Sequence, residues 1–316
     1  AAFQATFAII TVALISGAIA DRAKFGAWMV FAGVWATLVY FPVASWIFNF
    51  TIADGEMTSG GWLVYNVGAL DFAGGTAVEI NSGAAALALA LVLGKRIGFA
   101  KGVHKPHNVP FVLLGAGLLW FGWFGFNAGS AVGANGLAAQ ALGTTTVAAA
   151  AAAMGWVFLD KIQGHKLSAM GACIGAVVGL VAITPAAGYV TIPSSLAIGL
   201  IASINSNLIV SKFPKGKVDD ALDVFACHGV GGMVGMLLTG VFASNSVNSI
   251  VGNKQGLIYG DVTLFFIQLK ALVLVSAFAF SVSYFLFFIV NKITPLRVSE
   301  DKEELGLDIT QHGEFL

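Results

Sequence analysis

Long apolar runs separated by short polar connections occupy most of the 316-residue chain. A helix needs about 20 apolar residues to cross a hydrocarbon core of ~30 Å. The runs are continuous rather than alternating, which excludes the strands of a membrane barrel. We therefore predict nine membrane-spanning helices, near residues 2–20, 26–48, 76–94, 109–132, 138–159, 168–185, 193–211, 222–243 and 263–291.

Composition supports an all-α polytopic membrane protein. Hydrophobic residues make up 58% of the chain and charged residues only 10%, which is unlike a water-soluble domain. The net charge is zero, so nothing points to a nucleic-acid partner. The two cysteines, Cys173 and Cys227, lie in apolar runs, so a disulfide framework or zinc site is not expected. The spans hold no metal-ligand cluster and no nucleophile–base pair, and we expect no metal, no cofactor and no enzyme activity.

The basic residues are concentrated in alternate connections between the predicted spans. Fourteen of the sixteen fall in every second connection or in the C-terminal tail: Arg22, Lys24, Lys95, Arg96, Lys101, Lys105, Lys161, Lys166, Lys212, Lys215, Lys217, Lys292, Arg297 and Lys302. Cytoplasmic loops carry such an excess of Lys and Arg. We expect a multi-pass protein of the cell membrane with its start outside and its C-terminus in the cytoplasm.

A polar spacing repeats in two of the spans. Glu79 stands eight residues after Asp71, and His228 stands eight residues after Asp220. The two spans run in opposite directions and lie five spans apart, as an inverted-topology repeat requires. We predict that Glu79 and His228 face each other near the midplane, and that Asp71 and Asp220 cap their helices and anchor the preceding loops.

Each member of the central pair also has a structural interpretation. Glu79 can bridge or cap helices, and His228 can be a hydrogen-bonded packing residue. Ionisable side chains inside a membrane are by default functional, however, because placing them there is costly. The matched spacing favours a functional role for both.

Five motifs carry a resemblance to a known family. They are "DFAGGTAVEINSG", "LLWFGWFGFNAGSA", "ITPAAGYV", "DVFACHGVGGMVG" and "LRVSEDKEELGLDITQHGE", and in this order they resemble the ammonium transporter family Amt/Mep/Rh, in its Amt/Mep branch. The resemblance implies an eleven-helix inverted-repeat bundle, assembled as a homotrimer with a hydrophobic pore in each subunit. The nine spans would be family spans three to eleven, with the first two helices missing. Residues 1–297 would form the transmembrane domain and 298–316 a cytoplasmic tail.

The resemblance also assigns roles to single residues. Phe7 and Phe126 would be the stacked gate of the pore, and Phe7, Phe48 and Ser130 would form an outer ammonium site that Asp71 supports indirectly. The family commonly has tryptophan where this chain has Phe48, so we expect a weaker or reshaped outer site.

The first of the family's twin pore histidines is replaced here by Glu79, and the second is His228. We expect ammonium to be recruited at the outer site, deprotonated and conducted through the pore, with Glu79 and His228 relaying protons. The alternative is an ammonium sensor with little or no flux that signals through a cytoplasmic partner. A PII-type regulator on the cytoplasmic face is a further partner that the resemblance suggests for bacteria and archaea.

Overall fold

The computed structural model describes residues 1–53, 56–99, 106–212 and 217–315. Lys101, Lys105 and Lys215 of the basic connections lie outside these residues. In chain order the helical and strand elements are α1 (Ala2–Ser16), η1 (Gly17–Ile19), α2 (Phe25–Trp35), η2 (Ala36–Tyr40), α3 (Phe41–Phe48), β1 (Phe50–Ala53), β2 (Glu56–Gly60), η3 (Trp62–Val67), η4 (Gly75–Ile80), α4 (Asn81–Leu93), α5 (Val109–Gly129), α6 (Gly136–Ile162), α7 (Ala169–Ile183), α8 (Ile192–Lys212), η6 (Phe225–Val230), α9 (Gly231–Phe242), η7 (Ser249–Val251), η8 (Leu257–Tyr259), α10 (Thr263–Ile293), α11 (Glu300–Leu305) and η9 (Asp308–His312).

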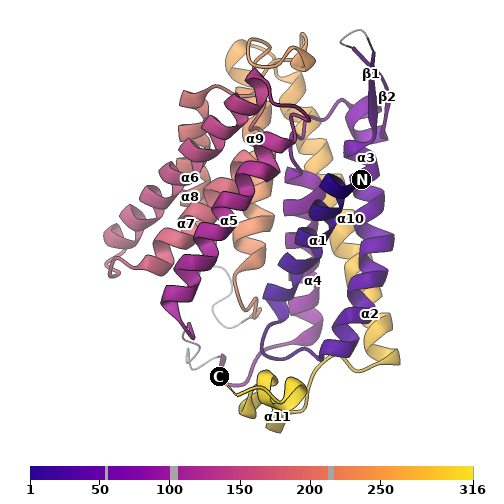
Figure 1. Ribbon diagram of the computed structural model, residues 1–316, viewed down its shortest axis with the longest axis vertical. Helices are drawn as coiled ribbons and strands as arrows, with labels where there is room; N and C mark the ends of the chain where they lie inside the picture. Colours follow the sequence, from indigo (N-terminus) through magenta and orange to yellow (C-terminus); the bar gives the residue numbers. More distant parts are fainter. Residues whose placement is uncertain (54–55, 100–105, 213–216, 316) are drawn as a thin grey trace.

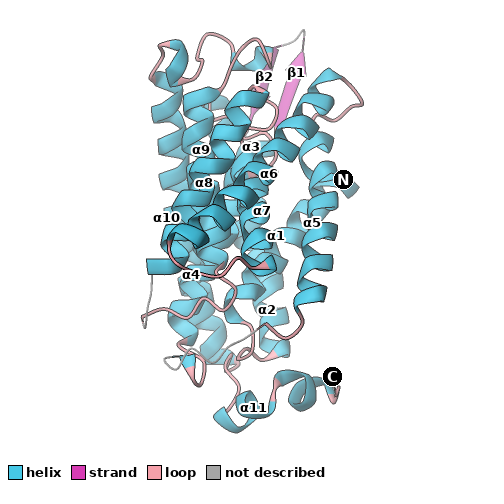
Figure 2. Cartoon of the chain, turned by 90° about the vertical axis from the view of Figure 1, so that its left-hand side faces the viewer, coloured by secondary structure: helices cyan, strands magenta, loops and turns pink. Residues whose placement is uncertain are grey.

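The helices form one bundle with distinct ends. In Figure 1, α5 to α8 lie on one side and α1, α2, α4 and α10 on the other. The antiparallel β1–β2 hairpin projects from one end, and α11 lies across the opposite end (Figures 1 and 2). We call these the hairpin end and the tail end.

Eight helical segments in the described residues are long and apolar enough to cross a membrane. They match eight of the nine predicted spans. The ninth, predicted over 168–185, forms the shorter 15-residue helix α7. Pro185 lies two residues after its last residue, Ile183, and proline has no backbone N–H to continue the helical hydrogen bonds. The chain turns there instead, over residues 184–189.

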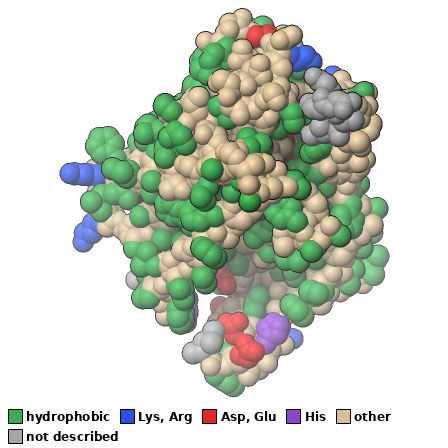
Figure 3. Space-filling model, turned by 45° about the horizontal axis from the view of Figure 1, so that its top comes forward, with side chains coloured by type: hydrophobic (Ala, Val, Ile, Leu, Met, Phe, Trp, Pro, Cys, Tyr) green, Lys and Arg blue, Asp and Glu red, His purple; other side chains and the backbone are tan. Residues whose placement is uncertain are grey.

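The outside of the bundle is apolar. Phe111, Leu118 and Phe121 of α5 are 69%, 63% and 73% exposed. Hydrophobic side chains spread over the visible sides of the molecule in Figure 3, with few charged groups among them. Apolar surface of this extent marks a membrane or protein contact.

Side-chain caps start three of the long helices. Asn108, Asn135 and Ser168 each accept a hydrogen bond from the amide three residues further on, at the N-termini of α5, α6 and α7. Small residues then bring helices close: a Cβ at Gly179 of α7 or Gly199 of α8 would lie within 2.4 Å of the Ala148 carbonyl oxygen of α6. Such contacts are the usual means of helix packing in membranes.

The predicted inverted repeat is visible in two spans, residues 75–93 and 225–242, which we call the broken spans because each changes from π-helix to α-helix along its length. Each begins with a π-helical segment, η4 or η6, and continues as an α-helix, α4 or α9. The guanidinium group of Arg22 contacts the carbonyl oxygens of both Gly94, after the end of α4, and Asp219, before the start of η6. One span therefore ends where the other begins, so the two run in opposite directions.

Candidate functional site

The two broken spans meet at a buried acid–histidine pair. His228 Nδ1 lies 2.7 Å from Glu79 Oε2, and the Glu79 side chain is 1% exposed. The second oxygen, Oε1, has no hydrogen-bond partner in the described part of the chain. The structure thus brings together the two residues that the repeated spacing singled out, and it leaves one carboxyl oxygen available to another donor.

A cavity of about 560 Å³ lies between α1 and α5 beside this pair. Glu79 lines it together with apolar side chains, among them Ile10, Trp123 and Phe126. Trp123 donates its indole N–H to Thr184 Oγ1 at 2.9 Å, which fixes the ring against α7. Glu79 therefore borders an almost entirely apolar space.

The predicted gate residues stack on each other. The ring centroids of Phe7 and Phe126 lie 4.4 Å apart with 20° between the ring planes. Phe48 meets Phe7 edge-on at 5.6 Å. Phe126 lines the cavity beside Glu79, while Phe48 lines a second cavity towards the hairpin end. Phe7 therefore contacts one ring from the lining of each cavity.

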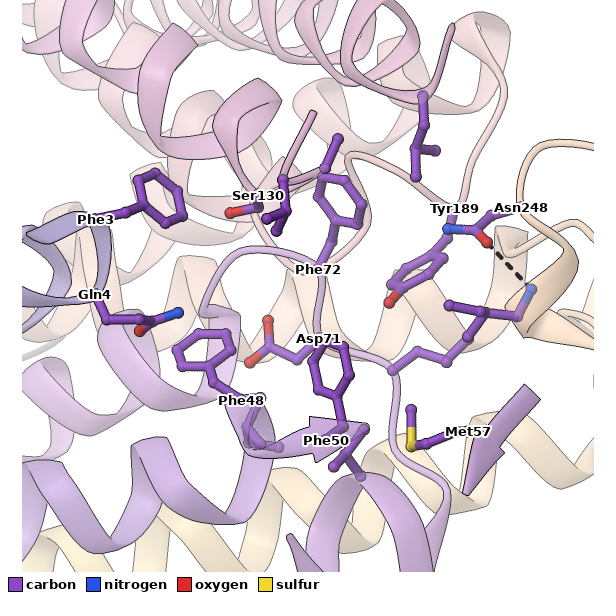
Figure 4. A pocket seen from close by; sticks show the side chains of 17 residues that line it. Phe3, Gln4, Phe48, Phe50, Met57, Asp71, Phe72, Ser130, Tyr189 and Asn248 are labelled. Carbon is purple, nitrogen blue, oxygen red and sulfur yellow. Dashed lines mark hydrogen bonds between the residues drawn. The ribbon is translucent and has the colours of Figure 1, made fainter. Parts of the chain in front are cut away.

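The second cavity has a volume of about 460 Å³ and is shown in Figure 4. Phe48, Ser130 and Asp71 all line it. Ser130 donates its hydroxyl hydrogen to the Phe126 carbonyl oxygen at 2.8 Å, so its oxygen lone pairs remain free to accept a hydrogen bond from a ligand. Trp46, two residues before Phe48, instead packs against Trp62 and Phe278.

Asp71 is fully engaged as a local anchor. Its Oδ1 accepts the amides of Gly74 and Gly75, and its Oδ2 accepts the amide and hydroxyl of Thr76. These bonds hold the turn that begins η4, in agreement with the expected capping role. Its contribution to the cavity is therefore to fix the surrounding backbone.

Sequence reasoning missed most of the residues that line the hairpin-end cavity, among them Gln4, Phe72 and Tyr189 (Figure 4). Phe72 meets Tyr189 edge-on at 5.4 Å. A Cβ at Gly188 would lie 2.0 Å from the Phe72 ring, so the glycine of "ITPAAGYV" permits this contact. Two features of the sequence could have indicated these residues. Gln4 is a polar residue inside an apolar run, and Gly188 stands directly before Tyr189.

Three residues hold the tail ends of the two broken spans, and we call Arg22, Arg96 and Asp219 the tail-end clamp. Arg96 binds Asp219 through two nitrogens, Nε to Oδ2 at 2.9 Å and Nη2 to Oδ1 at 2.8 Å. Burial opposes ionisation of Asp219, but the hydrogen bonds and charge of Arg96, helped by the charge of Arg22, outweigh it and hold its pKa below the usual range. The clamp fixes α4 relative to η6, and hence Glu79 relative to His228.

We expect Asp219→Asn to lower the free energy of unfolding by about 3 kcal/mol, because Arg96 loses its buried partner and keeps only the exposed Asp21. A depressed carboxyl pKa stabilises the fold above the unfolded-state pKa of about 4, and this stabilisation is lost as the pH falls through the folded-state value. Melting in detergent at pH 7 and in acid measures both effects. Asp21→Asn is the control, since Asp21 also pairs with Arg96 but its side chain is 66% exposed. An equal loss in both variants would contradict the clamp.

Fold and site together define a helical, multi-pass membrane protein in which two oppositely directed spans meet at a buried acid–histidine pair, and in which two phenylalanine rings stack on each other. The whole chain, residues 1–316, matches the Ammonium Transporter Family. An ammonium transporter of Mycobacterium tuberculosis is 50% identical over 99% of this chain and 66% of its own length. The crystal structure of Candida albicans Mep2 is 39% identical, with a TM-score of 0.85, over 94% of this chain and 65% of that one. A structure described as a sensor Amt protein is 29% identical, with a TM-score of 0.85, over 98% of this chain and 75% of that one.

The chain belongs to the ammonium transporter family, and its fold is that of the Amt/Mep proteins. This confirms the resemblance drawn from the five motifs. The chain spans about two thirds of the length of the mycobacterial relatives that it matches.

Proposed function

We propose that this protein transports ammonium across the cell membrane by recruiting the ion at the hairpin-end cavity, deprotonating it and conducting ammonia past Glu79 and His228. The observation that carries the proposal is the 2.7 Å contact between these two residues in the apolar interior of a protein of this family. In this proposal the hairpin end faces outwards and the tail end faces the cytoplasm, as the distribution of basic residues predicts.

The outer site would select a small cation. The aromatic faces of Phe7 and Phe48 attract positive charge, and the Ser130 oxygen accepts one N–H hydrogen bond. Asp71 supports the site through the backbone that it anchors. Tryptophan is the strongest cation–π partner, so Phe48 gives this site a weaker attraction for a cation than a tryptophan there would.

The apolar cavity beyond the gate favours ammonia over ammonium, since a dehydrated ion is costly to carry through apolar space. The proton must therefore travel by another route. Glu79 and His228 are in hydrogen-bond contact, so a proton can pass between them. We assign them the role of a relay.

Ammonium-driven current in proteoliposomes tests the transport proposal. We expect a current that saturates with ammonium and is absent from empty liposomes. The likeness to a sensor Amt protein supports the second candidate, an ammonium sensor acting through a cytoplasmic partner. Binding of ammonium without current would favour the sensor and contradict transport.

The tail, residues 298–316, is proposed as a cytoplasmic element that supports transport. Arg297 contacts the carbonyl oxygens of Leu93 and Lys95 at the end of α4, and Glu303 accepts the Ile97 amide at 2.7 Å. Gln311 accepts the Phe25 amide at 2.8 Å at the start of α2. Glu303 of the tail therefore contacts the connection after α4 and pairs with Arg297, which contacts the end of α4.

Deleting residues 298–316 is expected to reduce the ammonium current several-fold while oligomers still form in the membrane, because the connection after α4 loses the contact of the Ile97 amide with Glu303 but the bundle keeps its helix packing. Flux and oligomer content, measured on the same preparations, check this. Glu303→Gln, which removes the charge that pairs with Arg297 at 2.9 Å, should give a smaller loss. Unchanged flux after the deletion would refute a role for the tail. The homotrimer and a PII-type regulator at the tail end remain predictions of the family resemblance.

A further inference from the structure

A small cavity at the tail end lies outside the site described above. Its volume is about 20 Å³, enough for one molecule of the size of water. Leu87 of α4 and Ile209 of α8 line its apolar side, and Asp220 and Asp223 line its polar side. Two carboxyl groups thus face a space for one small molecule, just before the span that carries His228.

Asp220 differs from its repeat counterpart Asp71. Both oxygens of Asp71 are engaged by the turn that follows it. In Asp220, Oδ2 accepts the Phe225 amide at 2.7 Å, but Oδ1 is buried and has no hydrogen-bond partner in the residues that the structure describes. A buried oxygen without a partner is costly unless a ligand or water satisfies it. The capping role predicted for Asp220 accounts for only one of its oxygens.

Asp223 is held in an uncommon conformation. Its φ is 54°, in the left-handed region that Asp and Asn tolerate better than most residues. Its amide donates to the Asp220 carbonyl oxygen at 3.2 Å, and its own carbonyl oxygen accepts the Cys227 amide at 2.9 Å. This tight turn brings the Asp223 side chain to the same cavity as Asp220.

Burial and the neighbouring charges favour the protonated form of Asp223. Burial, followed by the charge of Asp220, raises the pKa of Asp223 to about 7; Arg96 opposes this shift and Asp219 adds to it. Burial also raises the pKa of Asp220, against the amides of Phe225 and Val224 and the charges of His228 and Arg22. Arg96 already binds Asp219 and Asp21, so much of its charge is balanced.

We propose that Asp220 and Asp223 form a proton-release site that takes up the proton leaving His228 and passes it to the cytoplasm. This rests on the proposed function. His228 does not line the cavity, but it follows Ala226, which does, by two residues, and Asp223 by five. In this proposal the molecule in the cavity carries the proton from the side of His228 to the carboxyl groups. Imidazolium loses one proton and becomes neutral, one carboxylate gains it, and the carboxyl group then loses it to bulk water. The occupant is water, or ammonium formed at the same place.

Infrared titration of the purified protein tests the site without depending on transport. We expect a protonated-carboxyl band that disappears as the pH rises through about 7, and we expect Asp223→Asn to remove it. Asparagine tolerates the same φ, so the turn should persist. Asp220→Asn, which keeps an acceptor for the Phe225 amide, should shift the titration to lower pH because a neighbouring negative charge is lost. The matched control is Asp21→Asn, since Asp21 also has a positive φ, 69°, but lies outside the cavity.

Ammonium current measured against internal pH gives a second readout. We expect Asp223→Asn to lower the current about tenfold and to remove its dependence on internal pH between about 6 and 8, with the external pH profile unchanged. An infrared band or internal-pH profile unaffected by Asp223→Asn would overturn the proposal. A wild-type protein without any current would contradict the proposed function instead, and the infrared result alone would then decide the site.

Discussion

Replacing Glu79 with glutamine is expected to lower the ammonium-driven current about 100-fold, the lower end of what positioned proton transfer contributes. Glutamine keeps the size of the side chain and one acceptor oxygen opposite His228, but it cannot exchange a proton. The measurement is current in proteoliposomes, with oligomer content checked on the same sample. A well-assembled Glu79→Gln protein that carries wild-type current would show that the acid is scaffold.

Glu79→His is the matched variant, because it restores the pair of histidines usual in the family. We expect it to retain transport, with altered selectivity between ammonium and larger cations, since an acid in a dry pore stabilises a passing cation better than a neutral imidazole does. A purely structural role predicts the reverse order: glutamine would be tolerated, and histidine would disturb the packing.

Gly83→Ala is expected to have the largest effect on folding. A Cβ at this position of α4 would lie 2.2 Å from the Cα of Gly229 and 2.3 Å from its nitrogen, so backbone would have to move where the two broken spans cross. Overpacking of this kind costs about 3 kcal/mol. We expect little folded protein by size-exclusion chromatography and a lower melting temperature.

Gly115→Ala in α5 provides the control for that substitution. No heavy atom lies within 4 Å of a Cβ built there, and alanine is the better helix former. Its melting temperature should equal or exceed that of the wild type. If Gly83→Ala behaved in the same way, the close crossing of α4 and η6 would not be required for the fold.

Much of the bundle follows from hydrophobic length alone, since a bilayer imposes similar helix lengths on every span. The juxtaposition of Glu79 and His228 followed from their matched spacing after Asp71 and Asp220. The π-helical starts of η4 and η6 did not, because a single wide turn leaves no trace in hydrophobic periodicity. These segments are nonetheless what begins the two central spans.

The sequence indicated the membrane orientation of the basic residues but not the structural contacts that they make. Arg22 counts towards the positive-inside pattern, but it is fully buried and donates to the carbonyl oxygens of Ala20, Gly94 and Asp219. That set joins residues up to 197 positions apart, which no local pattern predicts. Asp71 and Asp220 have the same spacing to Glu79 and His228, so the sequence did not indicate that both oxygens of Asp71 but only one of Asp220 accept hydrogen bonds. That difference depends on the three-dimensional turn that follows each residue.

The contact between Glu79 and His228 joins residues 149 positions apart, and this separation has a consequence for synthesis on the ribosome. At ~5–20 residues per second, roughly 7 to 30 s pass between translation of the acid and of its partner. During that interval α4 meets the bilayer without the imidazole. A neutral acid is far cheaper than a carboxylate in hydrocarbon, so the nascent helix inserts with Glu79 protonated. The ion pair or shared proton arises only after the second half of the chain has arrived.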